Sequence, residues 1–85
     1  MKQIGKVHLV CNKQEGVSND REWVNETLVL GTGENRFLAF EVRGAEDVAE
    51  VEKLTKGQLV EVKYSVESRE YKERWYTSLR YQGVM

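Results

Sequence analysis

The chain has no proline and only one cysteine and one histidine among its 85 residues. Because a disulfide needs two cysteines, Cys11 cannot form one within the chain, and the fold does not depend on an oxidising compartment. His8 has no cysteine or carboxylate at metal-ligand spacing, which argues against a metal site. No apolar run reaches the roughly 18 residues of a membrane-spanning helix, and the N-terminus lacks the apolar region of a signal peptide. We therefore expect a cytoplasmic protein that is not embedded in a membrane and carries no metal or cofactor.

The sequence also lacks a large excess of either acidic or basic residues. The sequence holds 13 Lys and Arg against 14 Asp and Glu, a formal net charge of −1, whereas proteins that bind polyphosphate often carry a basic excess. The balance differs along the chain, because residues 44–57 contain four acidic and two basic side chains. The remainder therefore has a small basic excess. This distribution predicts a modestly basic face opposite an acidic helix, with salt-sensitive binding that depends on stacking.

Alternating polar and apolar residues dominate what is present. This period of two predicts β-strands over residues 3–10, 23–30, 36–43, 60–67 and 74–84. Gly5 is expected to bend the first strand or form a bulge there. The polar residues 12–21, the glycine-rich residues 31–35 and the charged residues 68–73 are predicted to be loops or turns.

One segment has the period of a helix instead. Val48, Val51 and Leu54 form an apolar stripe, and Asp47 followed by Glu50 is a variant of the capping box. The resulting order, three strands, one helix and two strands, is that of the OB-fold, a five-stranded Greek-key barrel. Small SH3-like barrels also have five strands but do not usually place a full helix after the third. We expect an all-β OB-fold barrel with one helix between strands 3 and 4, as a single domain over residues 1–85.

No group of residues predicts an enzyme. The segment Gly31-Thr32-Gly33 is similar to part of a phosphate-binding loop, but a strand follows it and no Gly-Lys-Ser/Thr completes it. The carboxylates alternate with Lys and Arg, as on a solvated sheet. We expect no catalytic site.

The eight aromatic residues are more informative. Phe40 and Tyr64 share the apolar phase of their strands and are predicted to lie in the core, whereas Phe37 is out of phase and Tyr71 lies in a charged segment. Exposed aromatic rings beside cations suit single-stranded nucleic acid, since each stacked base contributes about 1–3 kcal/mol. For Trp23 and Trp75 the sequence leaves both interpretations open, a plug at the end of the barrel or a base-stacking surface.

OB-folds bind ligands with strands two and three and with the loops that join strands one and two and strands four and five. Aromatic and basic residues fall in or beside these regions. The candidate interface consists of Trp23, Arg36, Phe37, Arg43, Arg69, Tyr71, Lys72, Arg74, Trp75, Tyr76 and Arg80.

Two stretches resemble a known family. Residues 57–71, GQLVEVKYSVESREY, and 74–79, RWYTSL, resemble strands four and five of single-stranded DNA-binding proteins. They are still more similar to a compact, little-characterised branch of short OB-fold proteins that carries Glu-Ser-Arg-Glu-Tyr and Arg-Trp-Tyr-Thr, found here at 67–71 and 74–77. The resemblance implies that Tyr71 and Phe37 stack on bases. Arg43 stands where that family usually has an aromatic residue, and a guanidinium can stack or meet a phosphate instead.

The sequence thus predicts non-catalytic, sequence-tolerant binding of single-stranded DNA, with RNA as another candidate ligand. The alternative is an OB-fold protein–protein interaction module, because Tyr, Trp and Arg also dominate the energetics of protein interfaces. Exposed strand edges in so small a barrel further predict a homo-oligomer, either a dimer or a tetramer.

Overall fold

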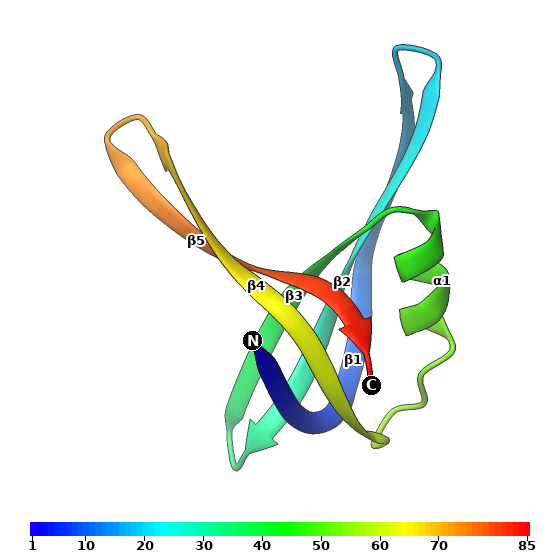
Figure 1. Cartoon of the computed structure of the whole chain (residues 1–85), viewed down its shortest axis with the longest axis vertical. Helices are drawn as coiled ribbons and strands as arrows, with labels where there is room; N and C mark the ends of the chain where they lie inside the picture. Colours follow the sequence, from blue (N-terminus) through cyan, green and yellow to red (C-terminus); the bar gives the residue numbers. More distant parts are fainter.

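The computed structural model describes all 85 residues as five strands and one helix. The elements are β1 (Lys2–Ser18), β2 (Arg21–Gly33), β3 (Arg36–Arg43), α1 (Ala45–Glu52), β4 (Leu59–Tyr71) and β5 (Arg74–Val84). The strands close into a barrel in the order β1-β2-β3-β5-β4 (Figure 1). These observations confirm the predicted all-β, five-stranded barrel with one helix between strands 3 and 4, an arrangement consistent with an OB-fold. No helix is long and apolar enough to cross a membrane.

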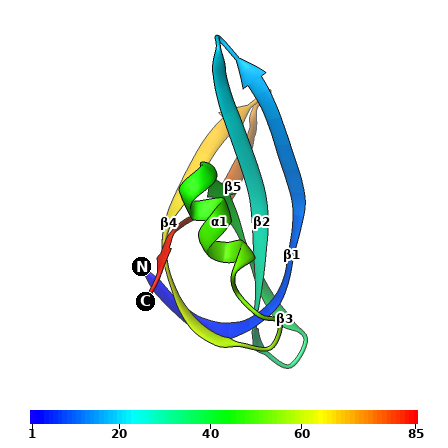
Figure 2. The same ribbon diagram turned by 90° about the vertical axis from the view of Figure 1, so that its right-hand side faces the viewer.

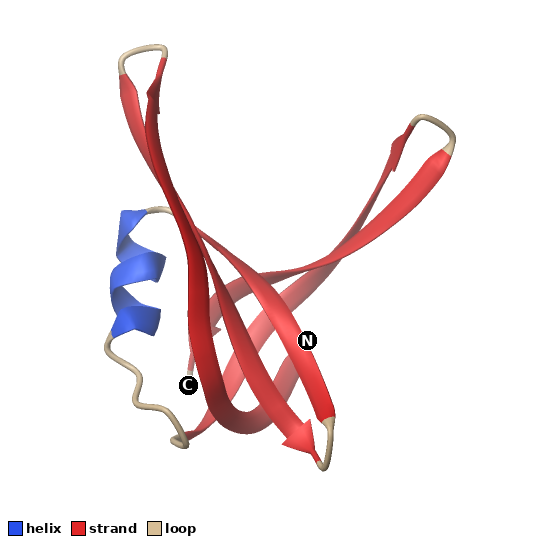
Figure 3. Ribbon diagram, turned by 180° about the vertical axis from the view of Figure 1, so that it is seen from behind, coloured by secondary structure: helices blue, strands red, loops and turns tan.

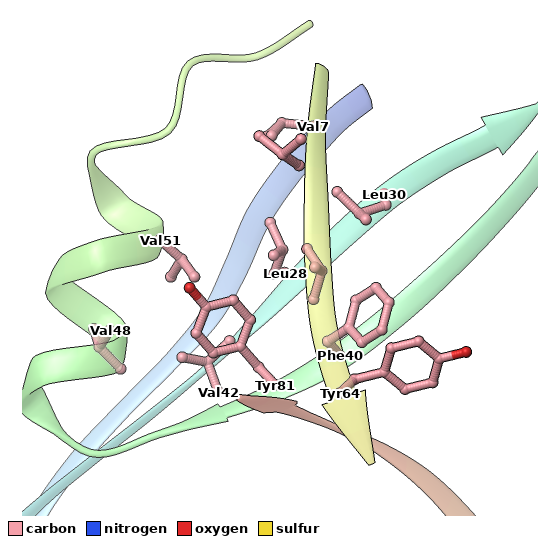
Figure 4. Close-up of a cluster of buried hydrophobic side chains, with 11 residues drawn as sticks. Val7, Leu28, Leu30, Phe40, Val42, Val48, Val51, Tyr64 and Tyr81 are labelled. Carbon is pink, nitrogen blue, oxygen red and sulfur yellow. The ribbon is translucent and has the colours of Figure 1, made fainter. Parts of the chain in front are cut away.

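Inward-pointing side chains from all five strands fill the barrel. Phe40 and Tyr64 are both buried, as predicted, and their rings meet edge to face with centroids 5.2 Å apart. The α1 helix covers part of the interior with Val48 and Val51 (Figure 4). The other core residues follow the predicted alternation: Val7, Leu28, Leu30, Val42, Val60, Val62 and Tyr81.

The barrel closes through a short parallel contact between β3 and β5. Only two residue pairs form it, Phe40 with Leu79 and Glu41 with Arg80. The remaining pairings are antiparallel, with β1 joined to β2 and β4, β2 to β3, and β4 to β5. This closure sets the middle of β5 beside the second half of β3, which brings residues of β3 next to those of β4 and β5.

The helix begins earlier than predicted. Gly44 is its N-cap, with φ 92°, and no side chain caps the helix, so the prediction that Asp47 caps it is wrong. Gly44 occupies the N-cap position because glycine adopts this left-handed conformation without strain. The chain therefore turns directly from β3 into α1, while the Gly44 N–H donates to the Val24 carbonyl at 2.9 Å. The helix also ends at Glu52, before Leu54, which packs against the core from outside the helix.

One polar contact ties α1 to the end of β5. The Glu50 carboxylate accepts a hydrogen bond from the Tyr81 hydroxyl and another from the Val84 N–H, the latter at 3.2 Å. Burial and this neighbouring carboxylate raise the pKa of Tyr81. The contact helps to hold the helix against the barrel, where Figure 2 shows it lying over β2.

The largest departures from the sequence prediction are two hairpin arms that project from one end of the barrel (Figures 1 and 3). Residues 12–21 and 68–73 were both expected to be loops. Instead β1 pairs with β2 as far as Ser18 and Arg21, and β4 pairs with β5 as far as Tyr71 and Arg74. Each arm ends in a two-residue turn.

Both turns have two consecutive residues in the left-handed region, Asn19 and Asp20 at φ 51° and 61°, and Lys72 and Glu73 at φ 50° and 64°. This is the geometry of a type I′ turn, whose twist matches that of the flanking strands. The sequence did not indicate these strands, because beyond the barrel neither face is buried and no apolar alternation is required.

The irregularities of β1 also differ from the prediction. The first register shift lies between Val7 and Leu9, so the bulge is at His8 rather than at Gly5. Gly5 is instead buried, and a Cβ atom there would lie 2.8 Å from the Gly31 carbonyl oxygen. A close approach of backbones, and not a bulge, therefore requires glycine at this position.

Candidate nucleic-acid interface

The arm formed by β4 and β5 presents aromatic and basic side chains on one face. Arg69 lies opposite Tyr76, and Tyr71 lies opposite Arg74, so these four residues share a phase of the ladder. Tyr71 and Tyr76 are 60% and 46% exposed. Together with Arg69 and Glu70 they line an open hollow of about 430 Å³. Two exposed aromatic rings with a neighbouring guanidinium thus lie outside the core.

The turn of this arm adds a further cation. The Lys72 ammonium lies 5.3 Å from the centroid of the Tyr71 ring, within the range of a cation–π contact. Lys72 directly follows Tyr71 in the chain and is the first of the two left-handed residues of the turn. A ligand stacked on Tyr71 would therefore meet a positive charge beside the ring.

At the base of the arm the arginines of β3, β4 and β5 come together. Arg43 and Arg69 line a small hollow of about 70 Å³ with Glu41, Glu67, Ser68 and Ser78. Arg43 pairs with Glu41 and Arg80 pairs with Glu67, both at 3.3 Å and both on the exposed surface. Exposed pairs of this kind contribute about 0–1 kcal/mol, so these arginines can be transferred to a phosphate at small cost.

Shared lining residues connect these hollows into one track. Arg69 lines both the hollow of the arm and the small hollow at its base. Arg43 and Glu41 line the small hollow and also a polar hollow of about 410 Å³ on the outer side of the sheet. The track thus runs from the aromatic arm across the end of β3 to the sheet formed by β1, β2 and β3.

Trp75 lies on the arm but on its other face. Its neighbour across the ladder is Glu70, and on the same face the hydroxyl groups of Ser68 and Thr77 bond at 3.0 Å. Trp75 is 70% exposed, so it does not plug the barrel. Trp75 and Tyr76 are therefore both exposed, although they point to opposite sides of the arm.

Trp23 belongs to the other arm. It lies opposite Gly16, and its indole covers that glycine so closely that a Cβ atom on Gly16 would overlap the ring. Trp23 lines the largest hollow, about 730 Å³, between this arm and α1. Across that hollow, Lys13 forms an ion pair with Glu52 at 3.0 Å. Trp23 is thus outside the core and away from the β4–β5 arm, but Arg43 lines the same hollow.

Phe37 and Arg36 lie at the far end of the barrel, beside the turn between β2 and β3. Phe37 is 52% exposed and its ring is 4.6 Å from that of His8. It shares the outward phase of β3 with Arg43, but the two lie six positions apart along the strand, roughly 20 Å. The structure brings together Arg43, Arg69, Tyr71, Lys72, Arg74, Tyr76 and Arg80. It places Trp23 in the hollow beside α1 that Arg43 also lines, and it leaves Arg36 and Phe37 apart from the others.

Other residues on the track were not identified from the sequence. Asn12 and Gln14 fall in the segment expected to be a loop, and Asn25 and Thr27 occupy outward positions of β2 that carry no aromatic or charged signal. All four line the polar hollow. Only the pairing of β1 with β2 across a register shift brings them to one place.

A buried carboxylate lies close to this region. Glu26 is 7% exposed in the inward phase of β2, and its Oε1 atom has no hydrogen-bond partner. Burial and the neighbouring Glu52 raise its pKa, and the nearby Lys13 partly offsets them. Glu52 in turn raises the pKa of Lys13. The structure contains no group of three or more His, Cys, Asp or Glu side chains arranged to hold a metal ion.

Residues 3–84 match the family described as a domain of unknown function, DUF3127. The chain belongs to this family. No curated protein and no solved structure matches the chain. The family extends over both arms, α1 and the barrel, so the arms are part of the family's domain and not an addition to it. The similarity to single-stranded DNA-binding proteins stays a prediction from the sequence.

Proposed function

We propose that the protein binds single-stranded nucleic acid, DNA in the first instance, on the track that leads from the β4–β5 arm to the outer sheet. One observation carries the proposal: Tyr71 and Tyr76 are exposed on the same face of the arm as Arg69, which also lines the neighbouring hollow of Arg43. Aromatic rings bind any base by stacking, and the cations follow the phosphates. The protein acts as a binding module and carries out no reaction.

The modest net charge is compatible with this function because stacking on aromatic rings does not require a basic excess. The cations of the arm and its base, Arg43, Arg69, Lys72 and Arg74, are interspersed with the acidic side chains Glu41, Glu67, Glu70 and Glu73. Stacking then supplies a large share of the affinity, and the phosphates add a smaller, salt-dependent share.

The test is an anisotropy titration of fluorescein-labelled oligo(dT) at 50 and 200 mM salt. If the four cations of the arm and its base contact phosphates, the fourfold rise in salt should weaken binding about 50-fold. The variant Arg69→Ala should weaken binding at both salts and make it less salt-dependent. Lys56→Ala, an exposed lysine between α1 and β4, is the matched control and should change neither.

The proposed function would be refuted if, at low salt, the protein bound none of oligo(dT), oligo(dC) and an RNA oligomer. The same titration with RNA decides whether the two nucleic acids are distinguished. Binding that Arg69→Ala and Lys56→Ala weaken equally would place the site elsewhere on the molecule.

The arms also support the expectation of a homo-oligomer. β1 pairs with β4 from Lys2 to Lys6, and the backbone of Val7 bonds to Gly57 and Gln58. Beyond Val7, along the arm, this edge of β1 has no paired strand, since β2 lies on its other edge. Open strand edges favour pairing with a second copy. We expect a dimer or a tetramer, measured by light scattering on a sizing column. A mass of one chain at all concentrations would contradict this expectation.

A further inference from the structure

The polar hollow on the outer sheet has an unusual lining. It forms where β1 departs from regular pairing, since the register shifts between Cys11 and Gln14 and Asn12 adopts φ 56°. Bulges of this kind redirect side chains and often adjoin functional sites. Val42 is the one apolar residue of the lining. The other lining residues are Asn12, Lys13, Gln14, Asn25, Glu26, Thr27, Glu41 and Arg43.

The chemistry of this hollow differs from that of the arm. Asn12, Gln14 and Asn25 each carry an amide with a donor beside an acceptor, and none of these amides forms a hydrogen bond with the protein. In a single strand every base can pair with one amide, but only adenine has an amino group flanked by an accepting ring nitrogen on each side, so only adenine can pair with two amides at once through that group. Arginine reads guanine, but the one arginine of this lining, Arg43, also lines the small hollow at the base of the arm, where we assign it to the phosphate backbone.

The hollow also lies at the correct place for a base. Arg43 lines it and lines the small hollow at the base of the arm, where Arg69 is the next cation. A strand stacked on Tyr71 and Tyr76, with its backbone beside Arg69 and Arg43, would continue over the three amides.

We propose that this amide-lined hollow binds one nucleobase of the strand and selects adenine; the inference rests on the proposed function. Binding is then tolerant of sequence along the aromatic arm and selective at a single position on the outer sheet. Asn25 and Gln14, one on each strand that borders the hollow, are the residues that read the base.

The test compares twelve-nucleotide strands of thymidine with strands that carry one central adenine, cytosine or guanine, each competed against labelled oligo(dT). The adenine strand should bind about five- to tenfold more tightly than the others. Asn25→Ala should abolish this preference, because the adenine strand loses more affinity than the other three strands. Gln82→Ala removes an exposed amide of β5 outside the hollow and should preserve the preference.

Gln14→Ala provides a second variant, because Gln14 is exposed on the arm and its truncation leaves the core unchanged. It should reduce the adenine preference in the same way. Equal binding of all four strands to the unaltered protein would overturn the base site and leave the proposed function intact. An equal loss for all four strands in Asn25→Ala would overturn it too, since this residue would then contact only the backbone. Failure of every strand to bind would overturn both proposals.

Discussion

Two tyrosines of the same strand allow a sharp test of where the chain binds and where it folds. Tyr71 is 60% exposed on the β4–β5 arm, whereas Tyr64 is 8% exposed and packs edge to face on Phe40 at 5.2 Å. Each is replaced by alanine. The two substitutions remove the same atoms from β4 and differ only in their surroundings.

For Tyr71→Ala we expect a loss of binding without a loss of fold. The ring is available to a base, and a stacked base contributes about 1–3 kcal/mol, so the Kd for oligo(dT) should rise about 5- to 150-fold. The ring is on an arm outside the barrel and its one aromatic-type contact is with Lys72. The free energy of unfolding should therefore change by less than about 1 kcal/mol.

For Tyr64→Ala the expectation is reversed. Removing a buried aromatic ring loses its transfer free energy and leaves a cavity, about 3–5 kcal/mol in total. That is a large part of the stability of a small domain, which is about 5–15 kcal/mol. The substitution also removes the ring that packs on Phe40, one of the two residues of β3 that pair with β5.

The assay combines urea denaturation followed by circular dichroism with the anisotropy titration. The reasoning is refuted by either of two results. One is a Tyr71→Ala variant that binds oligo(dT) as tightly as the unaltered chain. The other is a Tyr71→Ala variant that loses as much stability as Tyr64→Ala, since this would show that the arm is part of the folded core.

Three further predictions concern the barrel. Gly5→Ala should cost about 1–3 kcal/mol by urea denaturation, because its Cβ would meet a backbone carbonyl of β2 at 2.8 Å. Tyr81→Phe should cost about 1 kcal/mol in the same assay, since it removes the hydrogen bond to Glu50. Burial raises the pKa of Glu26 above its ordinary 4.5, so the folded state retains a proton that the unfolded chain has lost. Stability should therefore decline as pH rises from about 4.5 through the raised pKa, and Glu26→Gln should remove this part of the pH dependence in denaturation curves.

Each of these three predictions would be contradicted by a specific result. Gly33→Ala is the control for Gly5→Ala, because a Cβ at Gly33 has ordinary contacts with the side chain of Arg36 at 3.6 Å. Equal stability of the two glycine variants would contradict the close approach at Gly5. An unchanged urea midpoint for Tyr81→Phe would mean that Glu50 does not anchor β5. An identical pH profile for Glu26→Gln would show that Glu26 titrates as in water.

Alternation in the sequence predicted the interior of the barrel well. Leu28, Phe40, Val62 and Tyr81 all point inward as their phase indicates, because a strand that is buried on one face must repeat its apolar residues every second position. The same physical requirement produced the correct element order. Alternation could not predict the arms. Residues there, such as Gln14 and Arg69, are exposed, and because neither face of an arm is buried, the paired strands show no apolar alternation.

The residue types of the candidate site were predicted from the sequence, but the structure places these residues in different parts of the molecule. Phe37 is predicted to be exposed because it is out of phase on its strand, and Tyr71 because it lies in a charged segment, and both are exposed. Their distance apart was not predictable, since it depends on which end of the barrel each strand presents. Trp75 shows the converse, because it shares the phase of Tyr81 and is nevertheless exposed where the strand leaves the barrel.

The sequence by itself determined which side chains form the core, that three strands precede the helix and two follow it, and that cations accompany the aromatic residues. Only the tertiary structure decided the rest. The parallel closure of β3 on β5 set Arg43 beside Arg69, and the register shift in β1 set Asn12 and Gln14 beside Asn25. The physical reason is that periodicity records whether one face of a strand is buried, whereas the neighbours across a barrel are fixed by register and closure.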